Sequence, residues 1–378
     1  MYEIKISVRN LVEFIMRSGD LSVSSTGLKD ANAMQEGTRI HKKLQRKAGA
    51  GYHAEVALSH TSEVTYDGLT FQITVEGRAD GIYSDELGWN IDEIKGIYRD
   101  IHTLSEATPV HRAQALCYGL IYALQNTLDG IGIRITYCHI PTEEVRYFHE
   151  FISFAELQNW YDTLLASYAK WASWQIRWQE ERNNNIKSLE FPFSYRDGQN
   201  TLVKGVYQSI LRKKRLYIEA PTGVGKTIST IFPAVKSLGE NVSEKIFYLT
   251  AKTITRTVAE DTLFLLQEKK VPLKSVTLTA KEKICFLEKP ACNPAQCDYA
   301  KGHFDRVNDA VFDLLTHETI MTRETILEYA KKHIVCPFEM ALDTATWCDF
   351  IIGDYNYAFD PTASLKRFLS VDKENNFV

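Results

Sequence analysis

Three charged side chains in one short stretch have the types that phosphodiester cleavage needs. The segment VEGRADGIYSDELGWNIDEIKG carries Asp80, Glu93 and Lys95, with Gly88 marking a turn between them. Strand periodicity puts Glu93 and Lys95 on one face, and pairing across the turn brings Asp80 near them. Two carboxylates can hold divalent metal ions that activate water, and Lys95 can orient that water or stabilise developing charge. An exposed hairpin often carries such charges without a catalytic role, so this triplet alone is weak.

Two flanking motifs strengthen the catalytic interpretation. EGTRIHKKLQ places His41 on a helix, and HRAQALCYG places Gln114 and Tyr118 one helical turn apart on the helix after the hairpin. This order of residues resembles the PD-(D/E)XK nucleases of the RecB type, including the CRISPR-associated RecB-like enzymes. The resemblance implies a restriction-endonuclease-like α/β core with these roles: His41, Asp80 and Glu93 bind Mg²⁺ or Mn²⁺, Lys95 is catalytic, and Gln114 and Tyr118 position the substrate. Many relatives carry cysteines around this core, whereas residues 1–116 contain none.

A second motif, LYIEAPTGVGKT at residues 216–227, has residue types that suit phosphate binding. An apolar segment with a strand pattern enters a glycine-rich turn that ends in Gly225, Lys226 and Thr227, and a helix pattern follows. Such a loop turns backbone N–H groups and a helix N-terminus toward phosphate oxygens. Lys226 neutralises the β and γ phosphates, and the Thr227 hydroxyl binds Mg²⁺. A chance Gly-Lys-Thr in a turn between strand and helix is the alternative.

FPFSYRDGQ, upstream of this loop, adds a nucleotide-base contact. Arg196 and Gln199 resemble the adenine-recognising element of superfamily 2 helicases, although alone they also fit a plain helix start. The expected ATP-binding residues are Arg196, Gln199, Thr222, Gly223, Gly225, Lys226 and Thr227.

Five of the seven cysteines fall between residues 285 and 348. Cys285, Cys292, Cys297 and Cys336 lack the close C-x2-C pairs of structural zinc sites, and proline follows the last of them. Four thiolates with a terminal Cys-Pro favour a [4Fe-4S] cluster, with zinc or unrelated buried thiols as the alternatives.

The loop APTGVGKT, the segment LTAKTITRTV and the four cysteines ending in CPFE together resemble the first motor domain of iron-sulfur superfamily 2 helicases related to XPD and DinG. The resemblance implies a RecA-like P-loop domain with an iron-sulfur insertion at about residues 280–340. It also implies ATP-driven unwinding with 5'-to-3' polarity, on single-stranded or forked DNA.

IIGDYNYAFDP, residues 351–361, first suggests a magnesium motif at Asp354, but Tyr355 stands where a glutamate is expected. YNYAFDP instead resembles the helicase segment that precedes the DEAH box, and ENNFV resembles the start of the strand that carries that box. We therefore expect the chain to stop within the motor and to turn over ATP weakly or not at all.

Element patterns divide the chain near residue 188. Residues 1–188 predict an α/β nuclease domain with a mostly antiparallel sheet that ends in a long helix, and residues 189–378 predict a P-loop domain with a parallel sheet. The expected helices of the first part are 7–18, 35–48, 107–127 and 154–182, and its expected strands are 53–60, 63–67, 70–76, 79–84, 89–97, 132–140 and 144–151. In the second part we expect strands at RLYIEA, KIFYLT and SVTLTA.

Composition sets outer limits on function. The net charge of −4 argues against a general attraction to nucleic acid, so DNA binding requires local basic patches. No segment has a signal-peptide pattern or eighteen consecutive apolar residues, which favours a cytoplasmic protein without membrane contact. We expect an ATP-dependent DNA helicase fused to a metal-dependent DNA nuclease, acting in DNA repair or processing. The alternative is a module that binds ATP and single-stranded DNA without catalysis.

Overall fold

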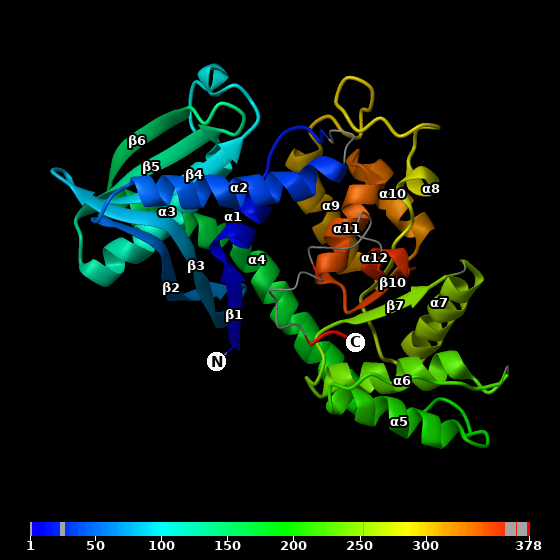
Figure 1. The fold of residues 1–378 in the computed structure, drawn as a ribbon. Helices are drawn as coiled ribbons and strands as arrows, with labels where there is room; N and C mark the ends of the chain where they lie inside the picture. The colour runs from blue at the N-terminus through cyan, green and yellow to red at the C-terminus, as the bar shows by residue number, and fades with distance from the viewer. Residues whose placement is uncertain (1, 23–26, 222, 252, 360–367, 369–375) are drawn as a thin grey trace. The chain divides into compact units, whose positions relative to one another are not determined.

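The computed structural model describes the chain except for residues 1, 23–26, 222, 252, 360–367 and 369–375 (Figure 1). The chain divides into two compact units, Met1–Arg17 with Ser24–Ile176, and Ser18–Val23 with Arg177–Val378. The division lies at Ile176, ahead of the boundary expected near residue 188. The reason is that the last turns of the long helix pack within the second unit, where Trp178 and Arg182 bond to Asp349.

The first unit combines a six-stranded sheet with helices. Its elements are β1 (Tyr2–Ser7), α1 (Val8–Met16), α2 (Gly27–Lys47), β2 (Tyr52–Tyr66), β3 (Leu69–Asp85), β4 (Gly88–Ile97), the 3-10 helix η1 (Ile101–Thr103), α3 (Pro109–Asn126), β5 (Gly130–His139), β6 (Val145–Ser153) and most of α4 (Phe154–Lys187). α3 packs on β4 and β5, and its face toward the sheet is apolar, with Ala113, Leu116 and Leu120 buried.

The sheet is mixed, and most of its pairings are antiparallel, as expected. Its strand order is β1-β3-β4-β5-β6, with β2 also paired to β3. β2 with β3, β3 with β4, and β5 with β6 are antiparallel, whereas β1 with β3 and β4 with β5 are parallel. α3 connects the two parallel strands β4 and β5, as a crossover helix must.

Two of the strand breaks expected from the sequence do not occur, because β2 and β3 are each continuous. Gly77 lies in the gap between the strands expected at 70–76 and 79–84. A Cβ at this position would lie 2.7 Å from the Tyr118 hydroxyl, so the glycine makes room for that ring instead of ending the strand. The turn between β2 and β3 lies at Asp67 and Gly68, both with positive φ, as the Asp-Gly pair favours.

The second unit alternates helices with short strands. Its further elements are α5 (Gln199–Leu211), α6 (Lys226–Gly239), β7 (Ile246–Thr250), α7 (Thr253–Glu268), β8 (Ser275–Thr277), α8 (Lys281–Ile284), α9 (His303–His317), β9 (Ile320–Met321), α10 (Arg323–His333), α11 (Pro337–Trp347), β10 (Phe350–Asp354) and α12 (Asn356–Phe359). The strand order is β7-β10-β8-β9 and every pairing is parallel, as expected.

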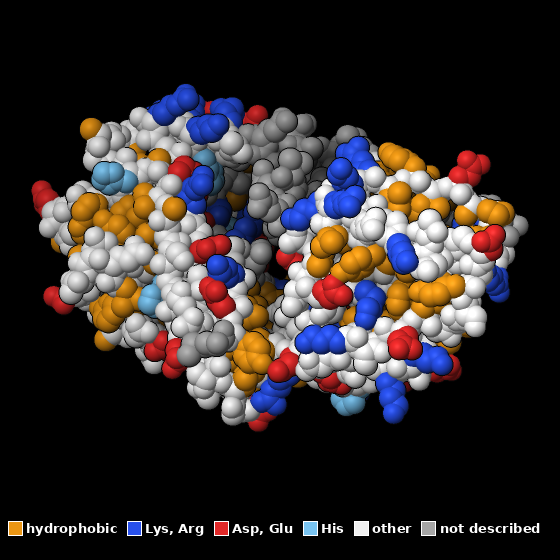
Figure 2. Space-filling view, turned by 90° about the horizontal axis from the view of Figure 1, so that it is seen from below, with side chains coloured by type: hydrophobic (Ala, Val, Ile, Leu, Met, Phe, Trp, Pro, Cys, Tyr) orange, Lys and Arg blue, Asp and Glu red, His pale blue; other side chains and the backbone are white. Residues whose placement is uncertain are grey.

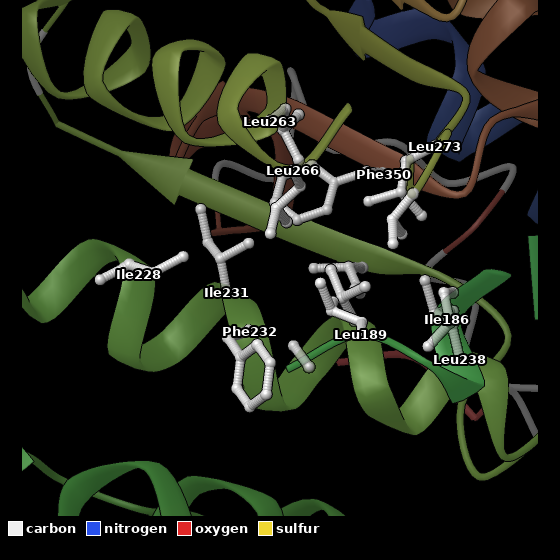
Figure 3. Packing of buried hydrophobic residues seen from close by; sticks show 14 of the residues in the cluster. Ile186, Leu189, Ile228, Ile231, Phe232, Leu238, Leu263, Leu266, Leu273 and Phe350 are labelled. Carbon is white, nitrogen blue, oxygen red and sulfur yellow. The ribbon is translucent and has the colours of Figure 1, made fainter. Parts of the chain in front are cut away.

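One apolar core joins the helices of this unit to its sheet. In Figure 3, Ile231 and Phe232 of α6 lie on one side of β7 and Leu263 and Leu266 of α7 on the other, with Phe350 of β10 beside them. All five side chains are at most 8% exposed. Burial of each large apolar side chain stabilises the fold by about 1.5–3 kcal/mol, so this core holds α6 and the loop before it in place.

The strand expected at RLYIEA is wrong. Residues 214–221 are irregular, and Leu216, Tyr217 and Ile218 are exposed, Tyr217 by 89%. A strand forms where a neighbouring strand takes up its backbone hydrogen bonds, and among the described residues no strand lies beside this segment. At the edge of the sheet formed by β7, Phe377 forms a parallel bridge with Lys245, and the Phe247 N–H donates to the Val378 carbonyl.

Surface charge is mixed. On the face drawn in Figure 2, basic, acidic and hydrophobic side chains are interspersed on both units, in keeping with the small net charge. None of the helices in the described ranges has the length and apolar character that a membrane crossing requires.

Candidate functional site

Asp80, Glu93 and Lys95 meet on one face of the first unit's sheet. The register pairs Gly81 with Asp92, so Asp80 on β3 stands opposite Glu93 on β4. Nζ of Lys95 lies 2.5 Å from Oε1 of Glu93. Glu93 is only 4% exposed, and its pKa is raised by burial and by the charge of Asp80, while Lys95 opposes the rise. The β3–β4 hairpin therefore gathers the three residues that the sequence singled out.

His41 joins this group from α2. Its Nδ1 lies 3.5 Å from Oδ1 of Asp80. Burial works to lower the pKa of His41, but the hydrogen bond and charge of Asp80 outweigh it, and the net pKa is raised. α2 comes close to β4 at Gly96, where a Cβ would lie 3.7 Å from Cα of Gly37. The part of α2 that carries His41 therefore lies against β4.

A cavity of about 370 Å³ opens beside these residues. It is lined by Arg9, Glu13, Gly37, Thr38, His41, Lys95, His111 and Gln114. Two positive side chains, Arg9 and Lys95, contribute to its wall. Gln114 itself is 5% exposed, so its amide is fixed within the wall rather than free in solvent. Both cations have acidic partners, since Arg9 pairs with Glu13 at 2.7 Å and Lys95 with Glu93 at 2.5 Å. The cavity wall thus combines two ion-paired cations with a buried amide.

Tyr118 lies one turn beyond Gln114 on α3 but is not among the cavity's lining residues. Its hydroxyl packs against the backbone of β3 at Gly77 and Arg78. Burial raises the pKa of the phenol, and the negative charges of Glu93 and Asp80 add to the rise. Tyr118 therefore borders the two carboxylates from behind and stays protonated, with its ring packed against the strand that carries Asp80.

Glu55 on β2 is a candidate ligand that the sequence did not reveal. Among the described residues, one group of three or more possible metal ligands has all its donor atoms within 4.8 Å of one another, and it consists of His41, Glu55 and Asp80. Glu93, expected to be the third ligand, is not in that group. The missed signal was the register of the hairpin: Glu55 and Asp80 are equally distant in sequence from the Asp67-Gly68 turn.

The phosphate loop has the expected backbone at its described residues. Gly223 and Gly225 have φ values of 86° and 73°, which favour glycine, and α6 begins at Lys226. The free N–H groups of the first turn of α6 point back along the helix axis toward the loop. Nζ of Lys226 donates to the carbonyls of Ala220 and Pro221, at 2.8 and 3.2 Å. Thr227 is in the first turn of α6, while Thr222 lies outside the described residues.

Arg196 and Gln199 contact this loop. Arg196 donates from Nη1 to the Gly223 carbonyl. Nε2 of Gln199 donates to the Val224 carbonyl at 3.2 Å, and its Oε1 accepts from the Arg196 N–H at 3.0 Å. A Cβ at Gly225 would lie 2.7 Å from Nε2 of Gln199, so the glycine also permits this contact. The structure therefore brings the expected base-binding pair against the expected phosphate loop.

The four cysteines occupy one stretch of the second unit as free thiols. Cys285 ends α8, Cys292 and Cys297 lie in the turns that follow, and Cys336 caps α11 and donates from its backbone N–H to Nδ1 of His303 at 3.2 Å. Burial is the main cause that raises the pKa of Cys336 to about 11.

Within the described ranges, these four thiols do not form a group of three or more with all donor atoms within 4.8 Å of one another. The structure therefore places the four cysteines in one stretch without showing a preformed metal or cluster site among the described residues.

Asp354 ends β10 without the geometry of a free metal ligand. Nη2 of Arg256 lies 3.3 Å from Oδ2 of Asp354, and Oδ1 accepts from the Asn356 N–H at 2.9 Å. Both carboxylate oxygens therefore have protein partners.

Comparison with family models matches residues 250–378 to the DEAD_2 family. The chain is 22% identical over 240 residues to a regulator of telomere elongation helicase 1 homolog from Caenorhabditis briggsae, with 52% of this chain and 24% of that protein covered. The corresponding Caenorhabditis elegans homolog is 22% identical over 233 residues, covering 50% of this chain and 23% of that protein. The chain thus spans about a quarter of the length of these curated relatives.

A solved structure named XPD_Helicase is 17% identical, with a TM-score of 0.31, and the match covers 47% of this chain and 31% of that chain. The DEAD_2 match lies within the second unit and supports a domain of the helicase type there.

Proposed function

We propose, on the premise that residues 250–378 carry a DEAD_2 domain, that this chain is part of an ATP-dependent DNA helicase of the iron-sulfur type fused to a metal-dependent DNA nuclease. The observation that carries the helicase part is the DEAD_2 match downstream of a glycine-rich phosphate loop. Single-stranded or forked DNA is the proposed substrate, the proposed polarity is 5' to 3', and the proposed setting is DNA repair or processing in the cytoplasm.

ATP would bind between the loop and the segment before α5. Gly223 and Gly225 let the backbone approach the phosphates, and Lys226 supplies the charge. Before it can do so, Lys226 must exchange its bonds to Ala220 and Pro221 for phosphate oxygens. Gln199 and Arg196 already bond to the loop, so a base held by this pair would stay in fixed relation to the phosphates.

The nuclease part rests on the meeting of His41, Asp80, Glu93 and Lys95 on one face of the sheet. An imidazole and carboxylates suit Mn²⁺ or Mg²⁺, which when bound would polarise the scissile phosphate and lower the pKa of water. Lys95 orients that water or stabilises the charge that develops on the phosphate. Gln114 holds the substrate from the cavity wall.

The cysteine stretch is the proposed [4Fe-4S] site, held by Cys285, Cys292, Cys297 and Cys336. Support comes from the four free, incompletely buried thiols and from the proline that follows the last of them. When bound, the cluster would tie the turns after α8 to the start of α11. Its proposed role is structural support of a segment that contacts the DNA strand.

Manganese-dependent degradation of single-stranded DNA tests the nuclease. We expect Asp80→Ala and Lys95→Ala each to reduce the rate by about 100-fold or more, because one removes a metal ligand and the other a charge aimed at the phosphate. Glu86→Ala, in the exposed β3–β4 turn, is the matched control and should keep the wild-type rate. Activity that survives both active-site changes would remove the proposal that this site cuts DNA, and a wild-type chain that leaves DNA intact would favour the DNA-binding module.

A further inference from the structure

Glu55 of β2 lies opposite Asp80 of β3 at a gap in the β2–β3 ladder. Ala54 pairs with Gly81 and Val56 with Ala79, whereas the ladder has no pairing between Glu55 and Asp80 themselves. His41 reaches the same point from α2, and the donor atoms of the three residues all lie within 4.8 Å of one another. This arrangement brings one imidazole and two carboxylates together from three separate elements.

The Gln45 side chain bonds to both of the strands that carry the two acidic residues. Nε2 of Gln45 donates to Oε1 of Glu55 at 2.9 Å and to the backbone carbonyl of Asp80 at 2.9 Å. Gln45 follows His41 by one helical turn on α2, so the two side chains share a helix face. A hydrogen bond that orients a carboxylate is typical of the outer shell of metal sites. α2 thus carries the candidate ligand His41 and also Gln45, which orients the carboxylate of a second candidate ligand, Glu55.

Glu55 and Glu93 differ in access. Glu93 is 4% exposed and its Oε1 lies 2.5 Å from the ammonium of Lys95. The Glu55 side chain is 48% exposed and lies 4.0 Å from Arg78. An ion arriving from solvent therefore reaches Glu55, His41 and Asp80 before it reaches Glu93.

The backbone at Glu55 is also unusual for a strand. Its φ is +56°, in the left-handed region that residues other than glycine and asparagine rarely adopt. Strain of this kind gathers at functional positions. Here the residue with the left-handed backbone is the one whose carboxylate lies within 4.8 Å of a donor atom of Asp80.

We infer that Glu55 is a ligand of a divalent cation, forming with His41 and Asp80 a three-residue site that an imidazole biases toward Mn²⁺ over Mg²⁺. The inference rests on the proposed nuclease function for its biological meaning, but the site itself is defined by metal binding.

Titration of Mn²⁺ into the full chain, followed by the loss of the free-ion electron paramagnetic resonance signal, tests the site directly. We expect Glu55→Gln and the positive control Asp80→Asn each to weaken Mn²⁺ binding by about 10-fold or more. Glu63→Gln is the matched control, since Glu63 is an exposed glutamate on the same strand. Glu55→Asn is the second variant, because asparagine tolerates the left-handed backbone and keeps the fold if glutamine does not.

The outcomes separate the site from the nuclease. Wild-type affinity in both Glu55 variants, or no binding by the wild-type chain, overturns the inference. Weakened Mn²⁺ binding in both Glu55 variants, with Glu63→Gln unchanged, supports it. If that pattern holds while the wild-type chain leaves DNA intact, the metal site stands and the proposed nuclease function fails.

Discussion

The backbone N–H of Ile94 donates a 2.7 Å hydrogen bond to Oδ2 of Asp80. This bond fixes the Asp80 carboxylate against β4, while its Oδ1 faces His41 at 3.5 Å. One oxygen therefore holds the side chain in place and the other remains turned toward the candidate metal ligands. The hairpin backbone, and not only its side chains, builds this part of the site.

Lys226 is the simplest residue with which to test the nucleotide site. We expect Lys226→Ala to weaken binding of a fluorescent ATP analogue by at least about 10-fold, because the loop loses the cation that faces the phosphates. Lys269→Ala, an exposed lysine just past the end of α7, serves as control and should bind as wild type does. Equal affinity in both variants would argue against phosphate binding by this loop.

The cysteine stretch predicts a visible cofactor. Protein purified without oxygen should be brown and contain iron and sulfide, and Cys336→Ser should lose much of both, because one of four thiolate ligands is removed. Cys348→Ser is the control, since that buried thiol lies outside the set. Stoichiometric zinc without iron would contradict the cluster.

His111 predicts a pH-dependent contribution to stability. Burial, followed by the charges of Lys95 and Arg9, lowers its pKa from 6.5 to about 4, and its Nδ1 lies 2.8 Å from the Tyr137 hydroxyl. Between these pH values the unfolded chain binds a proton that the folded chain does not, so stability falls as pH drops from 6.5 to about 4.

His111→Gln should remove this component while retaining a partner for Tyr137. The loss of unfolding free energy on acidification through that window should then be smaller in the variant, by on the order of 2 kcal/mol. Urea denaturation at both ends of the window measures the difference. Identical acid sensitivity of the two proteins would show that His111 is protonated in the folded state.

Arg182 and Asp349 form a buried ion pair in the second unit, each at 4% exposure. Asp349 also accepts hydrogen bonds from the Trp178 indole at 2.8 Å and from the Lys274 N–H at 2.9 Å. Arg182→Ala should lower the unfolding free energy by about 3–5 kcal/mol, because it leaves a buried charge without its main partner. Arg212→Ala, at an exposed position, should change stability little by the same denaturation measurement. Equal stability in the two variants would mean that water replaces the arginine.

The placement of three candidate residues of the first unit was predictable from sequence because short-range rules apply to it. Alternation along β4 placed Glu93 beside Lys95, and the hairpin brought in Asp80. Glu55 was missed because its position depends on the register of the long β2–β3 ladder, which is fixed by the distant Asp67-Gly68 turn. Counting outward from that turn would have placed the two carboxylates opposite each other.

The fold was less predictable where a residue's pattern has two meanings. Gly77 can end a strand or make space for a ring, and only the packing of Tyr118 decides between them. LYIE has the apolar, β-branched character of a strand, but strand propensity needs a neighbouring strand to pair with. Residues 214–221 lack one among the described residues.

At position 55, the residue that best fits the left-handed backbone is not a residue that can supply a carboxylate to a metal ion. Glycine there would relax the strand and is expected to raise stability by about 1 kcal/mol, but it would delete a carboxylate. Glutamate keeps the carboxylate and accepts the strain. Selection for thermostability alone would therefore drive residue 55 toward glycine or asparagine, and the resulting protein would be sturdier but have weaker affinity for metal.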